Sequence, residues 1–123
     1  MNHFNSMLYE QKFLLALFFT LISEVPVLFF LVKYFLKYKD LKIPTIIFVG
    51  ILVSSLTLPY LWFIFPAFVV DRITYLIVGE SLVVLVEAII YFKLLKLKLL
   101  DSFIVSMIAN IASIILGYLI YGI

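Results

Sequence analysis

Hydrophobic residues fill four long stretches of the chain, and polar residues are concentrated in the short segments between them. A helix needs roughly 20 apolar residues to cross the hydrocarbon core of a bilayer, and each stretch has that length. The predicted spans are residues 13–36, 43–65, 73–95 and 102–121. Because the connections are short, consecutive spans are expected to be antiparallel neighbours. The pattern predicts an all-α, polytopic membrane protein, with residues 1–123 forming one four-helix antiparallel transmembrane bundle.

The composition agrees with lipid as the main solvent. Of the 123 residues, 67% are hydrophobic and 13% are charged, whereas an ordinary soluble domain is roughly 45–50% apolar and about 25% charged. The absence of cysteine excludes disulfide bonds and thiolate sites. The one histidine, His3, lies at the polar N-terminal tip, where a frayed tail residue is favoured over a metal ligand. Whether the chain uses a cofactor or a metal stays unknown.

Basic residues cluster in two of the three connections between spans. These clusters are Lys33, Lys37, Lys39 and Lys42 in the first connection, and Lys93, Lys96 and Lys98 in the third. The second connection has only Asp71 and Arg72. The positive-inside rule therefore predicts that the first and third connections are cytoplasmic and that both termini are outside. The clusters mark membrane topology, so the expected partner is the lipid bilayer and not nucleic acid.

Aromatic and acidic residues also mark the ends of the predicted spans. Six aromatic residues are expected to be interface anchors, which we favour over ligand stacking: Tyr34, Tyr38, Tyr60, Trp62, Tyr118 and Tyr121. Asp40, Asp71 and Asp101 lie in connections or at span ends, where capping or solvation accounts for them. Asp101, followed by Ser102, is interpreted as the cap of the fourth span.

Three carboxylates fall inside the spans: Glu24 in the first, and Glu80 and Glu87 in the third. An acidic residue at the bilayer centre costs roughly 2.5–3.5 kcal/mol on insertion scales, and the cations all lie near span ends. A rise of about 1.5 Å per residue places Glu24 near mid-membrane, Glu80 in the outer third and Glu87 in the inner third. Glu80 and Glu87 share a helix face because they are seven residues apart. At least some of the three must be protonated, hold a cation or meet an external partner.

Small and polar residues form stripes on the other spans. In the fourth span they recur every three or four residues, at Ser102, Ser106, Asn110, Ser113 and Gly117. This stripe is either a packing seam or the lining of a pathway. Packing is favoured for the serines and Gly117, whereas both interpretations stay open for Asn110. The second span has Gly50, Ser54 and Thr57 along one side, followed by Pro59.

The first span carries Pro26 close to Glu24. A kink at this proline is expected to bring a carboxylate and free backbone carbonyls together at mid-membrane. All polar stripes should turn inward because lipid cannot satisfy them. The candidate substrate- or ion-binding residues are Glu24, Glu80, Glu87 and Asn110. The supporting residues are Pro26, Thr57, Pro59, Ser106 and Ser113.

Short motifs in all four spans resemble a family of small, four-helix, largely uncharacterised prokaryotic membrane proteins. They are Glu24-Val25-Pro26, Thr57-Leu58-Pro59 with Trp62, Glu80 with Val83, Glu87-Ala88 with Tyr91, and Ser106, Ala109-Asn110, Ser113 and Gly117. The family pattern has histidine where this chain has Leu58, so a metal site that uses this histidine is not implied here. The resemblance implies the four-helix fold and brings no established activity with it.

A more distant similarity is to the small multidrug exporters, which are four-helix proteins of about this length with a glutamate in the first span. The similar segment is Leu21-Ile22-Ser23-Glu24-Val25. The glutamates of the third span and the low glycine content, four in the whole chain, depart from that pattern.

Three functions are compatible with the buried acids. The favoured hypothesis is transport of protons, cations or a small cationic solute, in a homo-oligomer because four helices are few for a whole pathway. The alternative is a non-catalytic accessory subunit whose acids meet basic residues of a larger membrane complex. An intramembrane enzyme with Glu80 and Glu87 as an acid–base pair and Asn110 orienting the substrate is disfavoured, because no convincing nucleophile or phosphate loop accompanies them.

Overall fold

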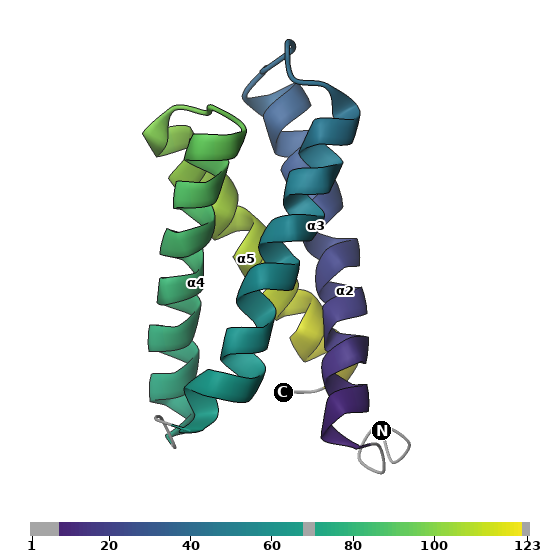
Figure 1. Ribbon diagram of the computed structural model, residues 1–123, viewed down its shortest axis with the longest axis vertical. Helices are drawn as coiled ribbons and strands as arrows, with labels where there is room; N and C mark the ends of the chain where they lie inside the picture. The colour runs from purple at the N-terminus through teal and green to yellow at the C-terminus, as the bar shows by residue number, and fades with distance from the viewer. Residues whose placement is uncertain (1–7, 68–70, 122–123) are drawn as a thin grey trace.

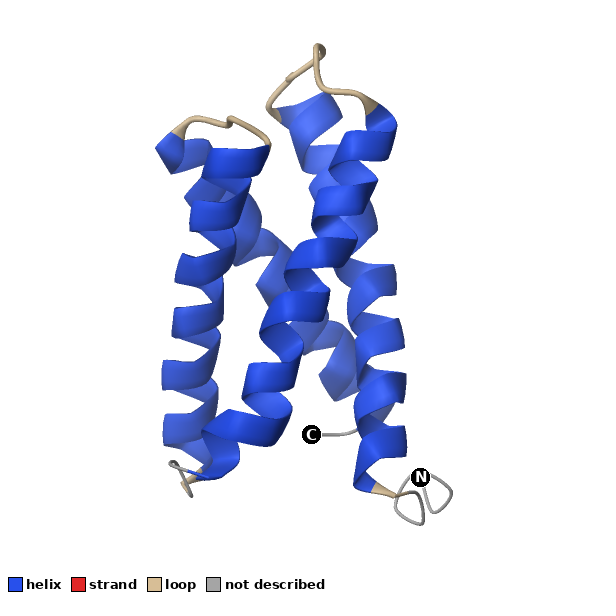
Figure 2. Cartoon of the chain, in the orientation of Figure 1, coloured by secondary structure: helices blue, strands red, loops and turns tan. Residues whose placement is uncertain are grey.

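The computed structural model describes residues 8–67 and 71–121, and every regular element in this part of the chain is helical (Figure 2). The long helices are α2 (Tyr9–Phe30), α3 (Ile43–Pro59), α4 (Arg72–Leu94) and α5 (Leu99–Tyr121). The π-helical segments η1 (Leu31–Phe35) and η2 (Tyr60–Ile64) extend α2 and α3, and a short 3-10 turn, η3 (Phe65–Ala67), follows η2. His3 lies outside the described residues.

Four helical segments are long and apolar enough to cross a membrane: Tyr9–Phe35, Ile43–Ile64, Ile73–Leu94 and Leu99–Ile120. Their outward faces are covered by exposed large hydrophobic side chains, among them Phe18, Phe48, Ile77 and Leu119. Such a surface suits a lipid solvent. The predicted all-α, four-helix membrane bundle is therefore confirmed.

The two ends of the bundle differ in the segments that they carry. Both ends of the described chain, η3 and the start of α4 lie at one end, the terminal end, and the two lysine-bearing connections lie at the other, the lysine end (Figure 1). Helix α5 crosses the bundle diagonally and packs against both α2 and α4. Helix α3 packs closely on α2 and has far less contact with α4. Sequential helices are thus close antiparallel neighbours within two hairpins, α2–α3 and α4–α5.

Polar side chains explain where two helices begin. Helix α2 begins at Tyr9, ahead of the predicted boundary at residue 13, where the Leu8 N–H donates to Gln11 Oε1 at 3.1 Å and Glu10 lies in the first turn. A carboxylate near a helix N-terminus is favourable because it faces the positive end of the helix dipole. At α4, Asp71 is the N-cap, and its carboxylate accepts from the Thr74 N–H at 2.9 Å and the Thr74 hydroxyl at 2.8 Å. These hydrogen bonds lower the pKa of Asp71, and its interpretation as a capping residue is confirmed.

The predicted cap of the fourth span is wrong. Helix α5 begins at Leu99, so Asp101 lies within its first turn. Ser102 is fully buried, and its hydroxyl donates to the Lys98 carbonyl at 3.0 Å. The carboxylate of Asp101 instead accepts a hydrogen bond from the Tyr38 hydroxyl at 2.5 Å.

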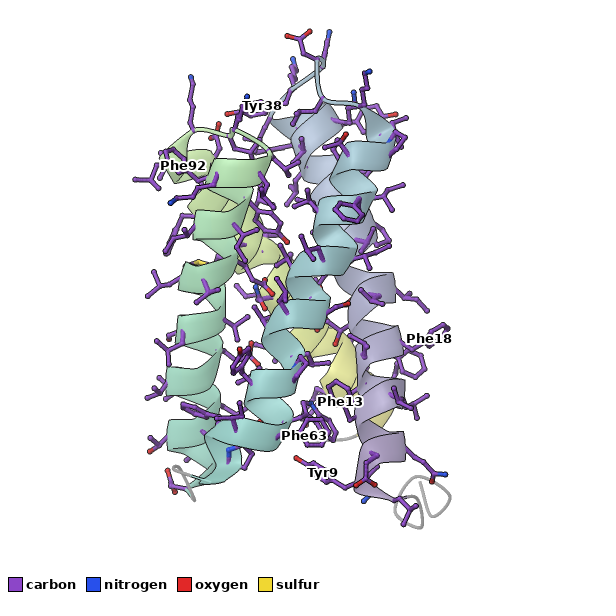
Figure 3. All side chains as sticks on the ribbon, in the orientation of Figure 1. Tyr9, Phe13, Phe18, Tyr38, Phe63 and Phe92 are labelled. Carbon is purple, nitrogen blue, oxygen red and sulfur yellow. The ribbon has the colours of Figure 1, made fainter. Side chains whose placement is uncertain are left out.

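Tyr38 joins the two hairpins at the lysine end (Figure 3). Its hydroxyl donates to Asp101 and accepts the Lys98 N–H at 3.1 Å. Partial burial, followed by the hydrogen bond to Asp101, raises the pKa of Tyr38 above its ordinary value of about 10. The residue expected to be an interface anchor therefore also links the α2–α3 connection to the α4–α5 connection.

The hydrophobic core occupies the lysine half of the bundle. Its buried members are Leu28, Val32, Ile46, Val49, Val53, Tyr91, Leu95, Leu97 and Val105. Gly50 permits a close approach of α3 to α2, because a Cβ atom at this position would lie 3.0 Å from Leu28 Cδ2 and 3.2 Å from Val25 Cγ2. All four helices contribute to this core, which closes the bundle on the lysine side.

Two tyrosine hydroxyls stabilise the terminal end of the bundle, where Pro66 interrupts the hydrogen bonding of the helix backbone. Pro66 has no N–H, so it cannot donate to the carbonyl of Trp62 in an α-helical pattern or to that of Leu61 in a π-helical one. The Tyr9 hydroxyl donates to the Trp62 carbonyl at 2.5 Å, and the Tyr75 hydroxyl donates to the Leu61 carbonyl. The start of α2 and the start of α4 are thereby attached to η2.

Candidate ion site

Glu24 and Ser54 form a buried pair between α2 and α3. The Ser54 hydroxyl donates to Glu24 Oε1 at 3.0 Å, and the two residues are only 4% and 1% exposed. Ser54 lies one turn before Thr57 on α3, so both hydroxyls face the interior of the bundle. The expected inward orientation of Glu24 is therefore observed, and its hydrogen-bond partner comes from the stripe on α3.

Glu87 is held by two side chains from different helices. Thr57 on α3 donates to its Oε2 atom and Asn110 on α5 donates to its Oε1 atom, both at 2.7 Å. The Asn110 amide also donates to the Ser106 carbonyl at 2.8 Å, so both of its N–H groups have acceptors. Glu87 is 1% exposed. This carboxylate therefore connects α3, α4 and α5 through buried hydrogen bonds.

The three glutamates and Asn110 surround a single cavity of about 30 Å³. Its polar lining is completed by Thr20, Thr57 and Ser113. A water molecule needs at least roughly 10–15 Å³ of such volume, so this central cavity has space for one or two water-sized particles. Residues that lie in four different spans thus converge on one small polar space.

A larger hollow of about 440 Å³, the vestibule, adjoins the central cavity. The two spaces share the lining residues Thr20, Leu58, Leu61, Glu80 and Ser113. The outer part of the vestibule is lined by Tyr9, Lys12, Trp62 and Tyr118, which belong to the terminal end. The hydrophobic core closes the opposite side. The vestibule therefore connects the central cavity with the terminal end of the bundle.

Glu80 is the carboxylate that faces both spaces. It lies seven residues before Glu87 on α4, two turns nearer to the terminal end. No hydrogen bond engages its carboxylate within the part of the chain that the structure describes. Glu80 is thus available to a ligand, whereas the oxygens of Glu87 already have protein donors.

The charges around the central cavity are unbalanced. It is lined by three carboxylates, and no lysine or arginine side chain belongs to its lining among the described residues. Buried like charges repel one another, and an unpaired buried charge is strongly unfavourable. A proton or another cation must offset part of this charge. Within residues 8–67 and 71–121, no group of three or more histidine, aspartate or glutamate side chains has the spacing to hold a metal ion.

The supporting residues divide into two groups. Thr57 and Ser113 line the central cavity, and Ser106 donates to the Val84 carbonyl at 2.8 Å beside Asn110. Pro26 and Pro59 do not line it. Pro26 is exposed, and α2 remains helical through it to Phe30, whereas Glu24 is buried. The expected meeting of the carboxylate with carbonyls freed by Pro26 is therefore not observed, because the proline occupies the opposite face of the helix.

The polar stripe of α5 serves both of the roles considered for it. Ser102 and Ser106 are fully buried and have backbone acceptors, as expected of a packing seam. Ser113 and Gly117 line the vestibule instead. A Cβ atom at Gly117 would meet nothing within 4 Å, so this glycine provides no close helix contact among the residues that the structure describes. Asn110 lies at the boundary, where the seam reaches the central cavity.

Sequence reasoning missed several residues of these two spaces. Ser54 was placed on a polar side of the second span, but its contact with Glu24 needed the packing of α2 on α3. Trp62 was interpreted as an interface anchor, yet it is half-buried and lines the vestibule with Lys12. A tryptophan and a lysine are both common at the end of a membrane span. Only the tertiary structure therefore shows that Trp62 and Lys12 line a hollow.

A scan against protein-family models, a search of curated proteins and a search of solved structures gave no match. The fold and the central cavity define the class of this chain as a four-helix membrane protein with a buried carboxylate cluster. Its resemblance to the small four-helix prokaryotic family stays a prediction.

Proposed function

We propose that this chain is a membrane transport protein whose central cavity takes up and releases a proton or a monovalent cation. The observation that carries the proposal is the convergence of Glu24, Glu80, Glu87 and Asn110 on one cavity of about 30 Å³. Ionisable groups inside membrane spans commonly mark ion pathways and proton relays. The unbalanced negative charge supports a cationic occupant, and the small volume supports a proton or a desolvated ion.

The position of the vestibule at the terminal end supports a transport cycle. The vestibule leads to Glu80 from the terminal end, and buried hydrophobic side chains fill the lysine half of the bundle. A transporter needs a second conformation in which the other side opens. The sparse contact between α3 and α4 leaves the two hairpins able to change their packing. By the positive-inside rule, the vestibule faces the outside.

The burial of the acids favours transport over the accessory-subunit hypothesis. That hypothesis needs carboxylates that basic residues of another protein can reach. Glu24 and Glu87 are instead 4% and 1% exposed and are engaged by Ser54, Thr57 and Asn110 of the same chain. The lipid bilayer is the proposed environment, and a homo-oligomer is the proposed assembly because four helices are few for a whole pathway.

Flux in proteoliposomes tests the proposal. The purified chain is reconstituted with a pH-sensitive dye inside the vesicles, and proton, sodium and potassium gradients are imposed in turn. We expect Glu87→Gln and Glu24→Gln to reduce the cation flux at least tenfold while circular dichroism and gel filtration show a folded protein. The control Glu10→Gln changes an exposed carboxylate of α2 and should leave flux unchanged. Full flux in both buried-site variants would overturn the proposal.

A further inference from the structure

The vestibule combines an aromatic wall with one carboxylate at its inner end. Aromatic side chains from all four spans line it, namely Tyr9, Phe19, Trp62, Tyr75 and Tyr118. Glu80 lies where the vestibule meets the central cavity. This residue has no hydrogen-bond partner in the described part of the chain. An unpaired carboxylate beside aromatic rings in a partly buried space favours a cationic ligand.

The aromatic wall is fixed before any ligand arrives. The hydroxyl groups of Tyr9 and Tyr75 donate to the backbone carbonyls of Trp62 and Leu61. The Tyr9 ring also packs on the Trp62 ring, with their centroids 5.1 Å apart. These contacts restrict the ring orientations, which lowers the entropy cost of binding.

The volumes separate two kinds of cation. Small-molecule sites usually measure roughly 300–1,000 Å³, a range that includes the vestibule at about 440 Å³ and excludes the central cavity at about 30 Å³. We infer that the vestibule binds an organic cation, a compact ammonium group with an apolar substituent, with Glu80 as its counter-charge. The inference rests on the proposed function, because it names the class of solute that the protein moves.

The charge distribution orients this ligand. Lys12 also lines the vestibule but lies eight residues before Thr20 on α2, which is about 12 Å along the helix. The ammonium group is therefore directed to Glu80, and the apolar substituent lies among the rings nearer to Lys12. Because Glu80 also lines the central cavity, the ammonium group and a cation in that cavity compete for the same carboxylate. This competition couples the two occupants.

The single tryptophan of the chain makes the binding directly measurable, because Trp62 lines the vestibule. The purified protein in detergent is titrated with benzyltrimethylammonium while tryptophan fluorescence is recorded. The neutral isostere neopentylbenzene, in which carbon replaces the ammonium nitrogen, is the matched ligand control. We expect a saturable fluorescence change with the cation and a Kd at least tenfold weaker for the neutral isostere.

Variants assign the binding to Glu80. Glu80→Gln should weaken the Kd for benzyltrimethylammonium at least tenfold, whereas Glu80→Asp, which keeps the charge, and Glu10→Gln should change it less than threefold. Gel filtration and circular dichroism check the fold of each variant. Equal binding of the neutral isostere, or unchanged binding in folded Glu80→Gln, would overturn the inference. The titration uses no gradient and the flux assay uses no organic cation, so each proposal can fail while the other holds.

Discussion

The Thr57 hydroxyl lies within hydrogen-bond distance of two acceptors, 2.7 Å from Glu87 Oε2 on α4 and 3.0 Å from the Val53 carbonyl on its own helix. A hydroxyl has one proton, so Thr57 donates fully to only one of them at a time. When it donates to Glu87, it connects α3 to α4, which have little other contact. Neutralisation of Glu87 weakens this bond and favours the Val53 carbonyl, because hydrogen bonds to charged groups are the stronger ones.

This arrangement predicts that Thr57→Val, which keeps the shape of the side chain, destabilises the bundle. The Glu87 oxygen loses a donor, and hydrogen bonds between membrane helices are worth about 0.6 kcal/mol on average and up to about 1.7 kcal/mol. We expect a loss in that range in the free energy of unfolding, measured by SDS titration of the protein in mixed micelles. Thr45→Val is the matched control, since Thr45 is exposed on the same helix. Equal effects of the two substitutions would contradict the prediction.

The spans and the inward orientation of the acids could be predicted because both depend on one strong effect, the cost of polar groups in lipid. Hydropathy placed four helices, and the same cost correctly turned Glu24 and Glu87 inward. The membrane depths of the three acids, derived from the rise per residue, stay predictions. The position of a span depends on local composition, and the orientation of an acid depends on the surrounding lipid. Both can therefore be predicted from one sequence.

The remaining features depend on tertiary contacts that periodicity does not contain. Tyr38 was interpreted only as an interface anchor. Its hydrogen bond to Asp101 could not be predicted, because it joins residues 63 positions apart in the chain. The start of α5 at Leu99 was missed because Asp101 and Ser102 form a plausible cap sequence, although the helix begins before them. Whether Glu80 shares a cavity with Glu24 was likewise undecidable until the crossing of α5 was known.

A second prediction concerns Tyr91, which is fully buried one turn after Glu87. Its hydroxyl has no hydrogen-bond partner among the described residues. A buried polar group without a partner costs about 1–3 kcal/mol. Tyr91→Phe should therefore raise the free energy of unfolding by about 1–2 kcal/mol, again by SDS titration. Tyr34→Phe is the control, because Tyr34 is an exposed tyrosine in η1, and it should change the free energy of unfolding little. A loss of stability in Tyr91→Phe would show that the hydroxyl has a stabilising contact.

A third prediction separates packing glycines from open ones. Gly50→Ala would place a methyl group 3.0 Å from Leu28 Cδ2 and 3.2 Å from Val25 Cγ2, inside the closed core. Overpacking of this kind typically costs about 1–3 kcal/mol. Gly117→Ala meets nothing within 4 Å and should gain up to about 1 kcal/mol from helix propensity. Thermal unfolding in detergent should lower the midpoint of the first variant and raise that of the second, and a lowered midpoint for Gly117→Ala would indicate a contact outside the chain.

A fourth prediction concerns the link between the hairpins at the lysine end. Tyr38→Phe removes the hydrogen bonds to Asp101 and to the Lys98 N–H. It should lower the free energy of unfolding by about 1 kcal/mol near neutral pH. Tyr60→Phe is the control, because Tyr60 is exposed at the other end of the bundle.

The same link has a pH dependence of known sign. The pKa of Tyr38 is raised in the folded protein by its partial burial and by the carboxylate of Asp101, so folding favours the neutral phenol. Its contribution is fully present below the unfolded pKa of about 10 and is lost as the pH rises through the higher folded value. The difference in thermal midpoint between wild type and Tyr38→Phe should therefore be constant from about pH 6 to pH 9 and narrow above about pH 10. All other side chains are the same in the two proteins, so their contributions cancel in this difference. A gap that widens above pH 10 would show that the phenolate is the form stabilised by the fold.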